Sequence, residues 1–178
     1  MLYVSNLFLK MKNQFLLLLA VIFFAEYPQM VQADSLENKP APICSLGSLN
    51  NTQHYDLEQF KGKVLYVDFW ASWCGPCAQS IPFMNTLHQD LEAKGLQIIA
   101  INMDEQPDDA ISFLKNKPAE FIVATDTNGQ CAKSFDVQTM PSTYLIDRKG
   151  RIRLIHFGYR PDEAEEFRFK VEALLREQ

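Results

Sequence analysis

Hydrophobic residues follow two different spacings along this chain, and the spacings separate strands from helices. The stretches 64–70 and 96–103 are near-continuous apolar runs, typical of central strands covered on both faces. Between them, from 75 to 93, apolar residues recur every three or four positions, which indicates an amphipathic helix. Pro82 should kink this helix. A strand, a helix and a strand in this order predict two parallel neighbours joined by a crossover.

Shorter patterns on either side complete an α/β fold. Further strands are expected at 43–46, 53–55, 121–124, 142–146 and 152–157, and further helices at 56–60, after an N-cap at Asp108, at 129–135 and after an N-cap at Asp162. Asn50-Asn51 joins the first two strands as an N-terminal β-hairpin, and the turn 147–150 closes a second hairpin. The predicted architecture is a mixed central sheet flanked by helices on both faces.

The first 33 residues have the pattern of an export signal. Lys10 and Lys12 precede an unbroken apolar run at 15–25, which suits a signal-peptide core and is shorter than the ~20 residues of a transmembrane helix. Val31-Gln32-Ala33 fits a small-x-small cleavage site. We expect residues 1–33 to be a signal peptide, with an uncleaved membrane anchor as the alternative, and the protein to be periplasmic.

The rest of the chain is predicted to be a short linker and one domain. Residues 34–40 are polar and contain a proline, which is typical of a linker, and residues 41–178 are enough for one domain with its own core. The 178 residues carry a formal net charge of −5 without a basic stripe. We therefore expect no nucleic-acid partner.

The strongest chemical signal is Cys74-Gly75-Pro76-Cys77, at the start of the predicted helix 75–93. Two thiols at this spacing can close a disulfide within one helical turn. The free N–H groups and the dipole of a helix N-terminus favour a thiolate at Cys74, which is therefore the expected nucleophile toward a partner disulfide. Cys77, one turn deeper, would then attack Cys74 and release the reduced partner.

A zinc site is the main alternative for the same two cysteines. Zinc would need two more ligands, and the three histidines, His54, His88 and His156, have no ligand spacing. We therefore expect no bound metal. We also expect no cofactor other than the redox-active disulfide of Cys74 and Cys77.

Asp68, within the predicted strand 64–70, is the candidate proton acceptor. A carboxylate buried behind the thiols would have a raised pKa and could take the proton of Cys77 as that thiol attacks, through a water molecule. The alternative is a polar residue whose hydrogen bonds are satisfied inside the strand.

These residues together resemble the thioredoxin fold. Trp73 stands directly before the first cysteine, and Pro82 lies where thioredoxins kink the same helix. Met140-Pro141 precedes a strand where that family places a cis-proline facing the thiols, and Asp68 falls where thioredoxins keep a buried carboxylate. The resemblance implies that Met140 offers its backbone to an extended substrate peptide and that Trp73, Gly75 and Pro76 form the surrounding contact surface.

Within that fold the chain most resembles the TlpA and ResA group of exported thiol–disulfide oxidoreductases. The opening Ala41-Pro42 with its hairpin, the extra helix and strand between Asp104 and Thr125, and the segment 144–150 all fit that group. The resemblance implies protein disulfide substrates, a membrane thiol electron donor and a role as a reductant, in cytochrome c maturation for example.

Two positions depart from the patterns of these relatives. Many members of the TlpA and ResA group have a glutamate where this chain has Ser80, and thioredoxin has a lysine beside its aspartate where this chain has Ala100. The groups that move protons therefore differ from both patterns.

Two cysteines remain, and other functions stay open. In an exported protein Cys44 and Cys131 could form a second, structural disulfide, or they could be free buried thiols.

A disulfide oxidase or isomerase would have the same fold with reversed electron flow. A peroxiredoxin would need a Pro-x-x-x-Thr-x-x-Cys frame, which is absent. A copper-binding assembly factor would use a wider cysteine spacing and a distal histidine, for which only His156 is available.

Overall fold

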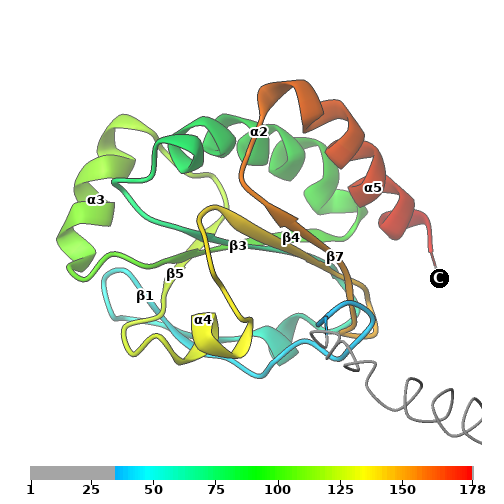
Figure 1. Cartoon of the computed structure of the whole chain (residues 1–178), viewed down its shortest axis with the longest axis horizontal. Helices are drawn as coiled ribbons and strands as arrows, with labels where there is room; N and C mark the ends of the chain where they lie inside the picture. The colour runs from blue at the N-terminus through cyan, green and yellow to red at the C-terminus, as the bar shows by residue number, and fades with distance from the viewer. Residues whose placement is uncertain (1–34, 178) are drawn as a thin grey trace, which may run out of the picture. The chain divides into compact units, whose positions relative to one another are not determined.

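A computed structural model describes residues 35–177, so the predicted signal peptide at 1–33 lies outside the described residues. The described part contains a central sheet with helices on both of its faces (Figure 1). This confirms the α/β class and the thioredoxin-like architecture expected from the sequence.

Within residues 35–177 one sheet has seven strands in the order β2-β1-β5-β4-β3-β6-β7. The strands are Ser45–Ser48 (β1), His54–Asp56 (β2), Val64–Trp70 (β3), Leu96–Asn102 (β4), Ile122–Thr125 (β5), Ser142–Ile146 (β6) and Ile152–Phe157 (β7). The central strands β3, β4 and β5 run parallel to one another. β6 runs antiparallel to β3, and β7 antiparallel to β6. The N-terminal hairpin of β1 and β2 extends the sheet at β5.

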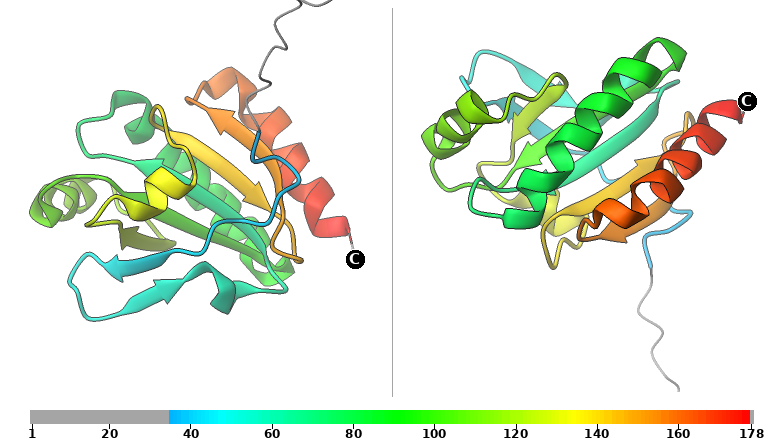
Figure 2. Two further views of the ribbon diagram at one scale, coloured as in Figure 1. Left: turned by 60° about the horizontal axis from the view of Figure 1, so that its bottom comes forward. Right: turned by 90° about the horizontal axis from the view of Figure 1, so that it is seen from above.

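Helices cover the sheet unequally. They are Leu57–Phe60 (η1), Gly75–Leu91 (α2), Glu92–Lys94 (η2), Pro107–Asn116 (α3), Gln130–Ser134 (α4), Pro161–Glu163 (η3) and Ala164–Arg176 (α5). The long helices α2 and α5 run over one face of the sheet, and the short helix α4 lies on the opposite face (Figures 1 and 2).

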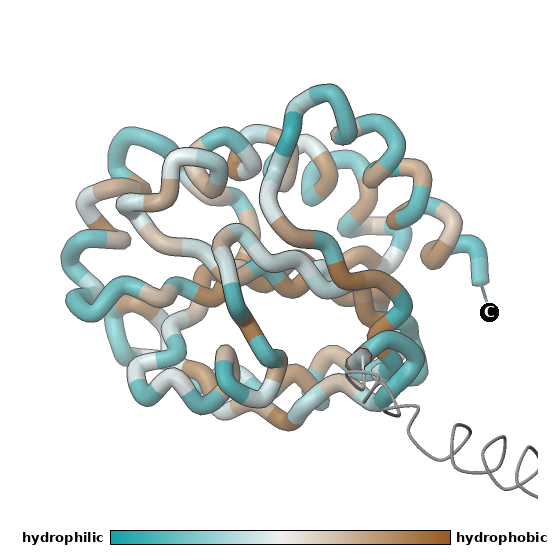
Figure 3. The backbone as a smooth tube through the Cα atoms, viewed as in Figure 1, coloured by the Kyte–Doolittle hydropathy of each residue, from teal (hydrophilic) through white to brown (hydrophobic). Residues whose placement is uncertain are grey.

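The alternation of side chains along β3 assigns each residue to one of these faces. Tyr66 and Trp70 belong to the hydrophobic cluster that contains the inner side of α2 and α5, whereas Val67 and Phe69 belong to the cluster around α4. Hydrophobic positions accordingly concentrate on the strands, with hydrophilic ones in the peripheral turns (Figure 3). By the same alternation Asp68 lies on the α2 side of the sheet.

Two predicted helix caps are wrong. The N-cap of α3 is Gln106 because Pro107, with its fixed φ, occupies the first helical position; Asp108 therefore lies inside the first turn. Asp162 belongs to the 3₁₀ turn η3, and the N-cap of α5 is Glu163. In both places a proline starts the helical turn before the aspartate that the sequence suggested.

The segment expected to be a linker is hydrogen-bonded to the sheet. The Asn38 N–H donates to the Ile152 carbonyl (2.6 Å), the Ile152 N–H donates to the Lys39 carbonyl (2.9 Å), and the Ala41 N–H donates to the Gly150 carbonyl (2.8 Å). Residues before 41 therefore take part in the fold.

Among residues 35–177 we find no helix with the length and apolar character needed to cross a membrane.

Candidate active site

Cys74 and Cys77 form a disulfide at the start of α2, with their Cα atoms 5.3 Å apart. Cys74 is the N-cap, and its Sγ accepts a hydrogen bond from the Cys77 N–H at 3.2 Å. Cys74 is 6% exposed and Cys77 is fully buried, so of the two cysteines only Cys74 keeps any contact with solvent. Trp73 beside it is 72% exposed.

The two residues between the cysteines, Gly75 and Pro76, are also exposed. Together with Trp73 they surround the outward edge of the disulfide. Pro76 lies in the first turn of α2, where a missing N–H breaks no helical hydrogen bond. This surface carries no charged side chain between 73 and 77.

The loop that carries Trp73 is held to the end of β4 by Asp104, a residue that the sequence analysis did not single out. The Ser72 N–H and the Ser72 hydroxyl both donate to Asp104 Oδ1 at 3.1 Å, and Asn102 Nδ2 donates to Asp104 Oδ2 at 2.8 Å. Such bonds to a charged, nearly buried acceptor are stronger than neutral ones. The sequence does contain a signal for this residue, since Asn102 and Asp104 are polar and stand at the carboxyl end of the parallel strand β4.

The Met140–Pro141 peptide bond is cis. The Pro141 carbonyl accepts a hydrogen bond from the Gly158 N–H at 2.8 Å, which links this loop to the end of β7. Met140 packs against the hydrophobic cluster that contains Cys74 and Cys77. The loop and the disulfide therefore share one packed region, although they are more than 60 residues apart in sequence.

Asp68 is completely buried on the same side of the sheet as Cys77. Its Oδ1 accepts a hydrogen bond from the Thr143 hydroxyl at 2.6 Å, and its Oδ2 has no hydrogen-bond partner among the described residues. Burial raises the pKa of Asp68 to about 7, against a smaller lowering by the Thr143 hydrogen bond. The group can therefore both take up and release a proton near neutral pH.

The neighbours of Asp68 in the sheet explain why its carboxylate is so poorly stabilised. On β4 the residue in register is Ala100, which is buried and apolar. On β6 the residue in register is Thr143, a neutral hydroxyl. No cation lies beside Asp68 on either neighbouring strand, so desolvation determines its pKa.

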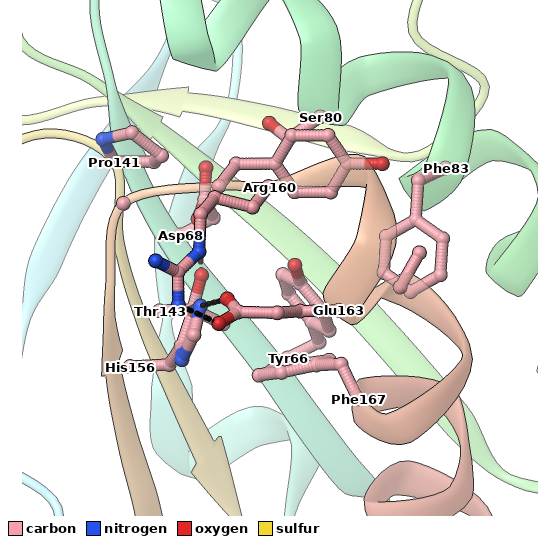
Figure 4. A pocket seen from close by; sticks show the side chains of 13 residues that line it. Tyr66, Asp68, Ser80, Phe83, Pro141, Thr143, His156, Arg160, Glu163 and Phe167 are labelled. Atoms are coloured by element: carbon pink, nitrogen blue, oxygen red, sulfur yellow. Dashed lines mark hydrogen bonds and ion pairs between the residues drawn. The ribbon is translucent and has the colours of Figure 1, made fainter.

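A cavity of about 300 Å³, part of it open to solvent, lies between β3, β6, β7, α2 and α5 (Figure 4). Asp68 and Thr143 line it from the sheet, and Ser80 lines it from α2. The Ser80 hydroxyl donates to the Cys77 carbonyl at 3.0 Å, so the cavity reaches the turn of α2 that carries Cys77. The enclosed space is close to the minimum that one water molecule needs.

Cys44 and Cys131 form a second disulfide between the N-terminal hairpin and α4, closing a separation of 87 residues. Both cysteines are 2% exposed and lie in the cluster on the α4 side of the sheet.

Within the described range no group of three or more histidine, cysteine, aspartate or glutamate side chains is arranged to hold a metal ion.

Comparison with known proteins gives concordant matches. Residues 36–170 match the family model described as Redoxin. A thiol-disulfide oxidoreductase ResA of Bacillus thuringiensis subsp. konkukian (strain 97-27) is 37% identical over 97 residues, which cover 54% of this chain and 56% of that protein. The match thus spans little more than half the length of that relative. ResA of Geobacillus kaustophilus (strain HTA426) is 30% identical over 118 residues, covering 66% of this chain and 67% of that protein.

A solved structure extends the match to nearly the whole described domain. A Chlorobium tepidum protein assigned as a thiol:disulfide interchange protein, DsbE, superposes with a TM-score of 0.75 and is 42% identical. The superposition covers 78% of this chain and 97% of that structure.

Proposed function

Because the chain belongs to the Redoxin family and has the thioredoxin fold, we propose that it is a thiol–disulfide oxidoreductase acting on disulfides of partner proteins. The observation that carries this proposal is the Cys74–Cys77 disulfide, in which Cys74 lies at a helix N-terminus with slight exposure and Cys77 is fully buried. The ResA and DsbE relatives carry names of the same chemistry.

The positions of the two sulfurs support different roles for them. In the reduced protein the Cys77 N–H and the α2 dipole stabilise a thiolate on Cys74, which attacks a substrate disulfide. One substrate sulfur leaves, and the other stays bound to Cys74 as a mixed disulfide. Cys77 Sγ then attacks Cys74 Sγ, the mixed disulfide breaks, and the second substrate sulfur leaves as a thiolate.

Asp68 serves as the proton acceptor in this second step. Cys77 must lose its proton to attack, and a carboxylate with a pKa of about 7 on the same side of the sheet can receive it through one water of the cavity. Asp68→Asn should therefore slow release of the reduced substrate near neutral pH.

The exposed residues around the disulfide form the contact surface for the substrate. Trp73, Gly75 and Pro76 lie on one side, and the Met140–Pro141 loop offers backbone N–H and C=O groups to an extended peptide on the other. We assign the protein to the periplasm as a reductant recharged by a membrane thiol donor, with cytochrome c maturation as the process served. The pattern of residues 1–33 supports export, and the Gly75-Pro76 dipeptide, which this chain shares with thioredoxin, supports the reducing direction.

Trapping of mixed disulfides tests the proposal. Cys77→Ser should leave Cys74 covalently bound to its partners, because the resolving thiol is missing, and the partners can be identified after non-reducing separation. Cys74→Ser is the matched control and should trap none. Equal trapping by the two variants, or none by Cys77→Ser, would overturn the assignment of roles. A reduction potential above about −150 mV would instead indicate an oxidase or isomerase.

A further inference from the structure

Three polar residues lie side by side across the sheet on the α2 face. Asp68 of β3 is in register with Thr143 of β6, and Thr143 is in register with His156 of β7. Side chains at such positions are direct cross-strand neighbours. The row therefore runs from the fully buried Asp68 to the partly exposed edge of the sheet, where the His156 side chain is 29% exposed.

At its outer end the row continues into an acidic residue of the next element. His156 Nε2 lies 3.7 Å from Glu163 Oε2, and Glu163 also bonds with Arg160. The Glu163 carboxylate interacts with both side chains in Figure 4. The ring of Phe167 of α5 packs against the imidazole, with 5.3 Å between centroids. The imidazole is thus held between an apolar ring and a carboxylate.

The cavity joins the two ends of the row. Asp68, Thr143, His156 and Glu163 all line it, and Asp68 Oδ2 has no hydrogen-bond partner among the described residues. On the opposite side of Asp68, β4 contributes only Ala100. A proton on Asp68 therefore meets polar groups toward β7 and an apolar wall toward β4.

The other titratable or charged groups around the cavity come from four elements and the connection after β7. They are Tyr66 on β3, Tyr159 and Arg160 after β7, and Glu163 on η3; outside the lining lie Lys170 on α5, which acts on Glu163, and Cys77 on α2, whose carbonyl accepts the hydrogen bond from Ser80. Burial and the neighbouring Asp68 raise the pKa of Tyr66 well above its ordinary value, so this phenol stays neutral. Arg160 remains a cation, because its bond with Glu163 raises its pKa further. Histidine is the side chain suited to accept and release a proton between these groups near neutral pH.

We propose that His156, positioned by Glu163, carries protons between Asp68 and solvent during thiol–disulfide exchange. This proposal rests on the proposed role of Asp68 as proton acceptor. A bound substrate contacts Trp73 and the Met140–Pro141 loop, and Pro141 also lines the cavity. The route leads away from this loop to His156 on β7, whose side chain is 29% exposed, so the buried proton can reach solvent there.

The proton steps balance without a redox change outside the sulfurs. Cys77 gives its proton to the Asp68 carboxylate when Cys77 Sγ forms the bond to Cys74 Sγ, and the substrate sulfur leaves with the electron pair of the broken bond. Asp68 then passes the proton through a cavity water to the imidazole, which becomes an imidazolium beside the Glu163 carboxylate. The imidazolium releases this proton to solvent, where the departing substrate thiolate is protonated.

Single-turnover kinetics with chemical rescue test the route. The reduced protein is mixed with a disulfide-bonded peptide, and Trp73 fluorescence follows the return to the oxidised state. His156→Ala should slow the resolving step about tenfold near neutral pH and added imidazole should restore it, since a small diffusible base can replace the missing ring. The reduction potential should not change, because a proton route alters rates and leaves the equilibrium as it was.

A second histidine–glutamate pair provides the control. His88 Nε2 lies 3.5 Å from Glu92 Oε2 on α2, outside the cavity lining. His88→Ala should keep the wild-type rate, with or without imidazole. Glu163→Gln should slow the resolving step less than His156→Ala does, because it removes only the partner of the imidazolium.

The outcomes separate the two proposals. If Asp68→Asn is slow without rescue by imidazole and His156→Ala keeps the wild-type rate, the route is wrong and the role of Asp68 stands. If Asp68→Asn keeps the wild-type rate, Asp68 is not the acceptor and the route falls with it. If the resolving step of His156→Ala is slow and unaffected by imidazole, and its thermal unfolding is changed, His156 has a structural role. If Glu163→Gln resolves at the wild-type rate, Glu163 does not position His156.

Discussion

Replacing Asp68 with asparagine should stabilise the oxidised protein at alkaline pH and have little effect at acidic pH. In the folded protein the carboxyl is completely buried, accepts one hydrogen bond from Thr143 and has a pKa of about 7. In the unfolded chain it ionises at its ordinary value of 3.8. Between these two values the folded state binds a proton that the unfolded state has released, so wild-type stability falls as pH rises through this window.

The shift sets the size of the effect. A change from 3.8 to about 7 is roughly three pKa units, and at 1.36 kcal/mol per unit this corresponds to a ceiling of about 4 kcal/mol above pH 7. Asparagine has nearly the same shape and keeps an oxygen for the Thr143 hydroxyl. The variant lacks the cost of ionising a buried carboxyl, so its advantage should grow from about pH 4 to pH 7 and then remain constant.

Urea denaturation of the oxidised wild type and of Asp68→Asn, at about pH 4.5 and about pH 8, measures this difference. The exposed Asp162 offers the control, because Asp162→Asn removes a charge that water solvates in both states. An advantage of Asp68→Asn that is the same at both pH values would refute the reasoning. So would a wild type more stable than Asp68→Asn at the higher pH.

Replacing Cys44 and Cys131 by alanine should lower the free energy of unfolding by at most about 4–5 kcal/mol, given the 87-residue separation, and should leave peptide reduction intact. Urea denaturation measures the change in stability, and an unchanged midpoint would contradict the prediction. Asp104→Ala should lower the free energy of unfolding by about 1–3 kcal/mol, because the Ser72 N–H loses its charged acceptor. Thermal unfolding measures this change, and an unchanged midpoint would mean that water replaces the lost hydrogen bond. Thr143→Val removes the hydrogen bond that lowers the pKa of Asp68 and should move that pKa above about 7; an NMR titration showing no upward movement would disprove the coupling.

The parts of the fold that the sequence predicted well are those specified by local pattern. The apolar run 64–70 has the same bounds as β3, and the predicted helix 75–93 corresponds to α2 followed by the short turn η2. The first strand was expected at 43–46 and lies at Ser45–Ser48, because its ends are set by pairing with β2 and β5. The bounds of β1 therefore depend on partners that are distant in sequence, and local spacing does not contain them.

The same distinction applies to the site. Cys74 and Cys77 are three positions apart in sequence, so the predicted start of the helix was enough to recognise them. The bonds from Ser72 to Asp104 and from Thr143 to Asp68 join residues 32 and 75 positions apart, so they depend on the order and register of the strands. His156 becomes a neighbour of Thr143 only through the antiparallel pairing of β6 and β7, which contains a register shift near Leu145.

The two disulfides differ in what can touch them, and this fixes how many electrons a folded molecule can exchange. Exchange between sulfurs requires direct approach of a thiolate. Cys131 belongs to α4 and Cys44 directly precedes β1, and the sheet separates their cluster from the one containing Cys74. A thiolate that approaches Cys74 meets the opposite face of the sheet from Cys44 and Cys131, so the fold presents one disulfide for exchange, which corresponds to two reducing equivalents in each molecule.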